Sequence, residues 1–153
     1  DGENTNTVMA VNAPSGNSSY GIVVGTGTNP PSATDHNLQS PISNGTGSGQ
    51  LQYGSHLFNP APVSGGVQSS SKPSSGLISV NGNVSSFQIT RTFTNNSGAT
   101  ITVSEVGIIA STAYYNGSYV EDYLLIVHDL LSSPVSVPNG SSLTITYAIQ
   151  TTT

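Results

Sequence analysis

Three histidines are the side chains of this chain best suited to acid–base or metal chemistry: His36, His56 and His128. Asp35 precedes the first of them and Asp129 follows the last. Neighbouring residues of a strand point to opposite faces, so His128 and Asp129 should not chelate one ion. A zinc site needs three or four converging ligands, and a calcium loop needs regularly spaced carboxylates. Neither spacing occurs, so the sequence predicts no metal site and no cofactor.

Hydrolytic motifs are incomplete as well. Glu121 and Asp122 are adjacent, and adjacent strand positions diverge, whereas a glycosidase needs two facing carboxylates about 5 to 9 Å apart. The chain has no G-x-S-x-G nucleophile elbow. The run Gly25-Thr26-Gly27 lacks the third glycine and the helix of a phosphate-binding loop. The sequence therefore predicts no catalytic residue and no enzyme activity.

A cluster of tyrosines surrounds Asn116-Gly117, namely Tyr114, Tyr115 and Tyr119. Tyrosines near a loop can stack on sugars or contact a protein partner. They can also form the ordinary rim of a sheet. Both interpretations remain open, and the first makes glycans a candidate ligand.

One charged pair is expected inside the molecule. The stretch 87–110 predicts two strands that are joined by a three-residue turn, Asn96-Ser97-Gly98. In that register Arg91, the only arginine, lies on the apolar face, diagonally across from Glu105. A lone arginine in apolar surroundings should be paired. We therefore predict a structural Arg91–Glu105 ion pair that is at least partly buried.

The composition excludes several classes of function. Charged residues make up 6% of the chain, against roughly 25% in ordinary soluble proteins, and the net charge is −5. Two basic residues, Lys72 and Arg91, cannot form a nucleic-acid-binding surface. No cysteine is available for a disulfide, and no apolar run reaches the length of a membrane span. The hydroxyl-rich surface, and a first residue that is not methionine, favour a processed extracellular or virion protein.

Six N-glycosylation sequons are present, and they are acceptors only in a protein that is exported from a glycosylating cell. They lie at Asn17, Asn44, Asn83, Asn95, Asn116 and Asn139.

Short alternating apolar runs between Gly, Asn and Pro turns predict an all-β chain, an antiparallel β-sandwich of Ig-like or jelly-roll-like type. A bulge is expected at Gly54. Near Gly107 we expect either a bulge or a strand that is buried on both faces. The most apolar segment, 120–131, is expected to be a central strand. The expected strands are 20–25, 50–58, 77–80, two within 87–110, 120–131 and 143–150.

The first 18 residues are predicted to form an arm outside the sandwich domain, which comprises residues 19–153. The arm is polar apart from one apolar patch, Val8, Met9, Ala10 and Val11. Sandwich edges are normally guarded by charge, especially lysine, and this chain has one lysine. We therefore expect the patch to add as a strand to the sheet of a neighbouring subunit.

Three stretches resemble a poorly characterised group of small β-rich proteins from tailed phages and environmental viral sequences, which are taken for virion structural components. They are 22–27 (IVVGTG), 90–109 (TRTFTNNSGATITVSEVGII) and 131–147 (LSSPVSVPNGSSLTITY). The resemblance implies a virion or extracellular structural role and brings no catalytic residue with it.

Two functional hypotheses follow. The first is a non-enzymatic structural subunit that binds copies of itself by β-strand addition, in an extracellular filament or in a virion surface or tail structure. The second is a carbohydrate- or receptor-binding β-sandwich module that uses the tyrosine rim.

Overall fold

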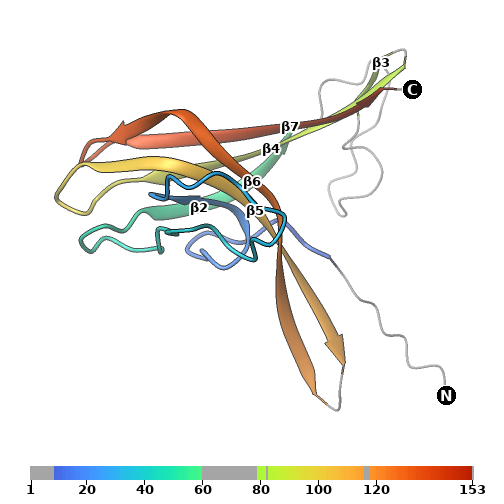
Figure 1. Cartoon of the computed structure of the whole chain (residues 1–153), viewed down its shortest axis with the longest axis horizontal. Helices are drawn as coiled ribbons and strands as arrows, with labels where there is room; N and C mark the ends of the chain where they lie inside the picture. Colours follow the sequence, from blue (N-terminus) through green and yellow to red (C-terminus); the bar gives the residue numbers. More distant parts are fainter. Residues whose placement is uncertain (1–8, 60–78, 82, 116–117, 153) are drawn as a thin grey trace.

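The chain forms an antiparallel β-sandwich, as predicted (Figure 1). The computed structural model describes residues 9–59, 79–81, 83–115 and 118–152. Every regular element in these ranges is a strand. The strands are β1 (Gly21–Gly25), β2 (Gln52–Asn59), β3 (Ser79–Asn81), β4 (Val84–Thr94), β5 (Ile101–Tyr115), β6 (Tyr119–Val137) and β7 (Ser142–Thr152).

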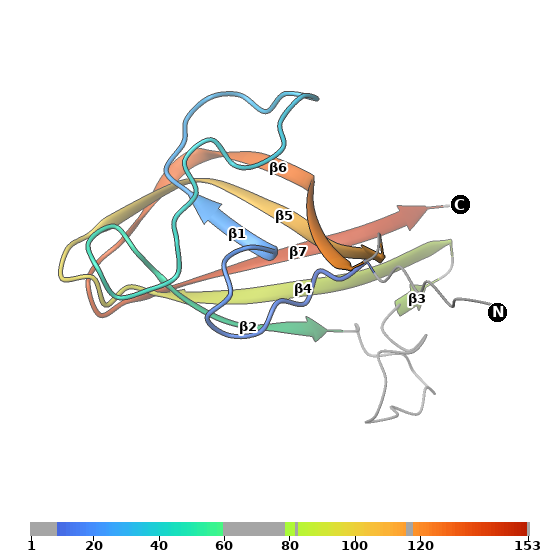
Figure 2. The same ribbon diagram turned by 90° about the horizontal axis from the view of Figure 1, so that it is seen from below.

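Two sheets pack face to face around one apolar core (Figure 2). In the first sheet β5 lies between β1 and β6. In the second sheet β4 is central, with β7 along one side and β2 and β3 in succession along the other. The core combines Ile22, Val24 and Ile108 from the first sheet with Ile89 and Phe93 from the second.

The second sheet shows the alternation that the sequence predicts. Ile89, Arg91 and Phe93 of β4 are buried, whereas the threonines between them are partly exposed. These outward side chains pair across the strands, with hydroxyl oxygens 2.9–3.0 Å apart in the pairs Thr90–Thr146, Thr92–Thr144 and Thr94–Ser142. Cross-strand pairs of this kind set the register of β4 and β7.

The predicted hairpin within 87–110 does not form, because β4 and β5 lie in different sheets. The connection 95–100 crosses the sandwich and packs on the turn that joins β6 to β7. The Asn95 side chain donates to the carbonyls of Ala99 and Val137, and its backbone pairs with Ser141 and Gly140. Gly98 has the expected positive φ, +86°. The turn that contains it connects the two sheets and does not join two paired strands.

Strand β5 is buried on both faces around Gly107, which was one of the two predicted alternatives. A Cβ at this glycine would lie 2.7 Å from the carbonyl oxygen of Val127 and 3.0 Å from Leu38. The pairing of β5 with β6 shifts register twice, between Val103 and Glu105 and between Ile108 and Ile109, just after this glycine. The second predicted bulge, at Gly54, is confirmed by a register shift between Tyr53 and His56.

Strand β6 is an edge strand, which corrects the prediction of a central strand over 120–131. It pairs with β5, and in the described ranges no strand pairs with its other side. The far end of the β5–β6 hairpin, drawn in orange, projects away from the packed sheets (Figure 1). Apolar composition predicted burial here, whereas several of its large side chains are exposed.

Candidate interaction site

The outer edge of β1 is sealed by side chains from the second sheet. His56 Nε2 accepts a hydrogen bond from the backbone N–H of Ile22 at 2.8 Å. The Arg91 guanidinium donates to the carbonyl of Ile22 at 2.9 Å. The Tyr53 hydroxyl accepts from the N–H of Val24 at 3.4 Å and donates to the carbonyl of Ile42 at 2.5 Å. Three side chains therefore take the place of a neighbouring strand.

The segment 40–42 completes this seal. Thr26 N–H donates to the carbonyl of Ser40 at 2.9 Å, and Ile42 N–H donates to that of Val24 at 2.9 Å. The first half of β2 is closed in a similar way. Tyr53 N–H donates to the side chain of Asn44, and Gly16 N–H donates to the carbonyl of Tyr53. Along β1 and the first half of β2, few backbone groups are therefore free for another chain.

Arg91 is buried, with 1% exposure, but its partners are carbonyl groups. Its Nε donates to Gly54 and its Nη1 to Tyr20 and Ile22. Its Nη2 donates to Pro14 at 3.1 Å and Asn17 at 2.6 Å. Burial lowers the pKa of Arg91 to about 10, so the guanidinium stays charged at neutral pH.

The predicted Arg91–Glu105 ion pair does not form. Between described residues, the ion pairs join His128 to Asp35 and to Glu105. The prediction needed β4 and β5 to be neighbours in one sheet, whereas they lie in different sheets. The Glu105 carboxylate lies with the segment 26–40, while Arg91 lies with Tyr53 and β1. Both charges are buried as expected, and each has other partners.

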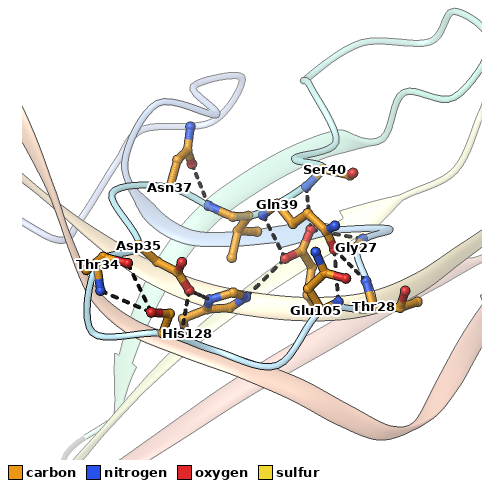
Figure 3. Close-up of polar contacts among 12 residues, drawn as sticks. Gly27, Thr28, Thr34, Asp35, Asn37, Gln39, Ser40, Glu105 and His128 are labelled. Atoms are coloured by element: carbon orange, nitrogen blue, oxygen red, sulfur yellow. Dashed lines mark hydrogen bonds and ion pairs between the residues drawn. The ribbon is translucent and has the colours of Figure 1, made fainter.

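Glu105 anchors the segment 26–40 to the first sheet (Figure 3). Its carboxylate, with 0% exposure, accepts hydrogen bonds from the backbone N–H groups of Gly27, Gln39 and Ser40 at 2.7–2.9 Å. Three backbone donors compensate the desolvation of the buried charge. Glu105 therefore holds both ends of this segment against the sheet.

His128 connects Glu105 to Asp35 (Figure 3). Its Nε2 lies 3.0 Å from Glu105 Oε2 and its Nδ1 lies 2.8 Å from Asp35 Oδ2. Both nitrogens can donate to a carboxylate only as the imidazolium. Hydrogen bonds from the backbone of Ser32 and from His128 lower the pKa of Asp35. The Asp129 side chain instead accepts from the hydroxyl of Tyr147 at 2.9 Å, so the neighbours His128 and Asp129 have separate partners.

This cluster has the chemistry of a structural clamp. Both ring nitrogens of His128 are engaged, and the Glu105 oxygens are occupied by backbone donors. Among the residues that the structure describes, no group of three His, Cys, Asp or Glu side chains is arranged to hold a metal ion.

His56 is present as one neutral tautomer. Because Nε2 accepts from Ile22, the proton must be on Nδ1, which lies 2.9 Å from the carbonyl oxygen of Ala13. Burial lowers the pKa of His56 to about 4. The charge of Arg91 acts in the same direction, and the hydrogen bond with Ala13 acts against it. Burial likewise raises the pKa of Tyr53 to about 12.

The described part of the N-terminal arm packs on its own domain. The backbone of Ala10 pairs with Ser111 of β5, with both hydrogen bonds at 2.8 Å. Val11 packs against the core, and Ala13 is buried. Met9 is largely exposed, and Val8 lies outside the described residues. Residues 10–18 therefore contribute to the sandwich domain of the same chain, which differs from the expected boundary at residue 18 and from an arm free to reach a neighbour.

The opposite side of the sandwich is open. The hydroxyl of Tyr147 on β7 binds Asp129 on β6, so these two edge strands lie next to each other. In the described ranges each is paired on one side alone, β6 with β5 and β7 with β4. Leu124 is 44% exposed and Ile126 is 50% exposed. Further exposed apolar side chains of β6 are Tyr123, Leu130 and Val135.

The tyrosine rim is placed only by its backbone. Tyr114 pairs with Val120 and Tyr115 with Tyr119, so all three predicted tyrosines lie at the tip of the projecting hairpin. Their side chains lie outside the described residues.

The sequons differ in accessibility. Asn95 is fully buried, and its Nδ2, the atom that would carry a glycan, donates to two carbonyls. It is therefore no acceptor in the folded chain. Asn17 and Asn44 are half-buried, and Asn83 and Asn139 are exposed. Asn116 lies outside the described residues.

Sequence reasoning did not identify the residues that seal β1. In the sequence His56 stands out only as a metal or acid–base candidate, and nothing singles out Tyr53. The bulge at Gly54 was a usable signal, because a phase change in β2 turns both Tyr53 and His56 inward. Their acceptors and donors on β1 are 29 and 34 residues away in the chain, so the pairing needed the tertiary structure.

Comparisons with known proteins give no relative: no family model, curated protein or solved structure matches the chain. The described residues include no helix that is long and apolar enough to span a membrane.

Proposed function

We propose that this protein is a non-enzymatic structural subunit that associates with copies of itself by β-strand addition, in an extracellular filament or in a virion surface or tail structure. The observation that carries this proposal is the contrast between the sealed β1 and β2 side and the open β6 and β7 side. A long unpaired edge with exposed apolar side chains invites another strand.

The chemistry of β6 supports association with an uncharged, β-rich surface. Strand β6 contains no lysine, the charged residue that most often guards an edge, and its guards are three carboxylates and Pro134. Main-chain hydrogen bonds along β6 and burial of Leu124 and Ile126 would stabilise the contact. Another copy of this chain offers the same kind of edge.

The test uses lysine substitutions on the two sides of the sandwich. We expect the wild-type protein to associate with increasing concentration in analytical ultracentrifugation. Leu124→Lys and Ile126→Lys should abolish association, because each would bury an unpaired charge at the contact. Leu57→Lys is the matched control, since Leu57 is 67% exposed on β2, at the sealed side. A wild-type protein that stays monomeric at millimolar concentration would refute the proposal.

The projecting hairpin favours a second candidate, a carbohydrate- or receptor-binding module. The backbones of Tyr114, Tyr115 and Tyr119 belong to the last paired positions of this hairpin, so the three residues are close together in the chain fold. Glycan-array binding by a monomeric protein, lost in a Tyr114→Ala/Tyr115→Ala variant, would support this function over the first.

A further inference from the structure

We infer that association through the edge strands closes at a dimer, in which two copies meet open side to open side about a two-fold axis, β6 against β6. This inference rests on the proposed function and specifies its partner surface and symmetry. A filament would then be built from such dimers through a separate contact.

The first step concerns the side that cannot accept a strand. An open-ended polymer of sandwiches needs a free edge on each side, so that β6 of one copy adds to β1 of the next. Here the outward groups of β1 are bonded to His56, Arg91 and Tyr53. An incoming strand would have to displace these side chains and leave the buried guanidinium without acceptors.

The second step concerns the edges that remain. Strands β6 and β7 both lie on the open side, where Tyr147 and Asp129 join them. Strand β3 is three residues long and the unsealed second half of β2 spans residues 56–59, so both offer much shorter edges than β6 and β7. A contact between edges must therefore use the open side of both partners. A surface that meets its own copy forms an isologous interface, and this uses up the open side of each copy.

The third step concerns the distribution of charge along β6. Glu121 and Asp122 lie near its beginning and Asp129 near its middle, while 130–137 contains no charged residue. A two-fold axis perpendicular to the sheet makes the two β6 strands antiparallel. The acidic beginning of one strand then lies against the uncharged end of the other, and Glu121 and Asp122 of the two copies are kept apart. A parallel pairing would place the acidic residues together.

The absence of cysteine from the chain gives a direct test. Single cysteines are introduced at Leu124, Ile126 and Leu130 on β6, with Leu57→Cys on β2 as the control, and mild oxidation follows. In a two-fold β6–β6 contact, at least one β6 position near the axis faces its own copy and should give a disulfide-linked dimer in high yield. Leu57→Cys should not.

Sedimentation equilibrium of the wild-type protein supplies the second measurement. We expect the mass to level off at twice the 15.6 kDa of the chain, and Ile126→Lys to return it to the monomer value. The closed dimer would be overturned by a mass that keeps growing with concentration, if Ile126→Lys abolishes this growth and no β6 cysteine cross-links to its own copy. The proposed self-assembly would still stand in that case. A wild-type protein that is monomeric at every concentration would overturn both proposals.

Discussion

Arg91 and Glu105 are two buried charges whose hydrogen bonds come mostly from the backbone. The cation is surrounded by five carbonyl groups and the anion by three N–H groups. Each charge thereby organises chain segments that have no regular pairing of their own. Arg91 binds carbonyl groups of residues 14–22 and of the β2 bulge, whereas Glu105 binds N–H groups of the segment 26–40. The two charges lie apart in the fold, so each one holds a different set of loop segments.

Arg91→Lys should lower the free energy of unfolding by about 3 kcal/mol or more. Lysine keeps the charge but loses the planar fork of five donors, and each buried carbonyl left without a partner costs about 1–3 kcal/mol. Urea denaturation gives the value. Thr92→Ser, at the next position on the outward face, should stay within about 1 kcal/mol of wild type. Equal losses in the two variants would contradict the role assigned to Arg91.

His56 should make the protein less stable in acid. Its pKa is about 4 in the folded chain, below the ordinary value of 6.5, so the unfolded chain binds more protons between these two values. The contribution of His56 is therefore complete above pH 6.5 and is lost as the pH falls toward 4. His56→Gln can still accept from Ile22 and donate to Ala13, and it should remove this part of the pH dependence.

Unfolding free energies measured between pH 7 and pH 4 provide the comparison. The exposed His36 is the matched position, and His36→Gln should retain the acid slope of the wild type. If His56→Gln has the same slope as the wild type, the neutral tautomer is not what holds β1 and β2 together.

At the scale of the elements, the connections between strands decide the architecture. The segment 95–100 carries turn residues that suit a hairpin, yet it crosses from one sheet to the other because Asn95 joins it to the turn before β7. The segment 26–40 has no regular structure, and Glu105 attaches it to the first sheet. Both connections depend on one buried polar side chain that satisfies several backbone groups.

Glu105→Gln should release the segment 26–40 without unfolding the sandwich. The amide NH₂ that replaces one carboxylate oxygen cannot accept hydrogen bonds from backbone N–H groups. We expect the amides of Gly27, Gln39 and Ser40 to exchange with deuterium roughly tenfold faster or more. Exchange in β4 and β7 should be unchanged, and Glu121→Gln, on the exposed part of β6, should alter neither region. Unaltered exchange in 26–40 would show that other contacts hold it.

At the scale of the whole molecule, the sandwich has two unlike sides. Side chains of Tyr53, His56 and Arg91 close the side formed by β1 and β2, and the side formed by β6 and β7 is left with exposed apolar residues. This asymmetry accounts for the proposed self-association and for its expected closure at a dimer. The N-terminal segment belongs to the closed side, because Pro14 and Asn17 supply acceptors to Arg91.

Deletion of residues 1–18 should therefore destabilise the monomer. Arg91 would lose two of its acceptors, the core would lose Ala13, and β5 would lose the pairing of Ser111 with Ala10. We expect the free energy of unfolding to fall by about 3 kcal/mol or more. Thermal and urea denaturation measure this loss. A truncated protein of wild-type stability that no longer associates would instead favour the arm as an inter-subunit strand.

The local pattern of the sequence was enough to predict the class of fold and most of the strands. The strand at 143–150 and the bulge at Gly54 both depend on interactions between near neighbours in the chain. The burial of Arg91 also followed from its position between Ile89 and Phe93. These features arise from the two-residue period of a strand, which sequence displays directly.

Contacts between residues far apart in the chain decide which strands pair and which edge stays open. The same turn residues suit a hairpin and a crossing between sheets, so the partner of β4 could not be chosen from 87–110 alone. Because β4 and β5 lie in different sheets, Glu105 binds the segment 26–40 and not Arg91. Burial is a property of the assembled sheets, and so the apolar residues of β6 looked like core in the sequence but lie on an exposed edge in the fold.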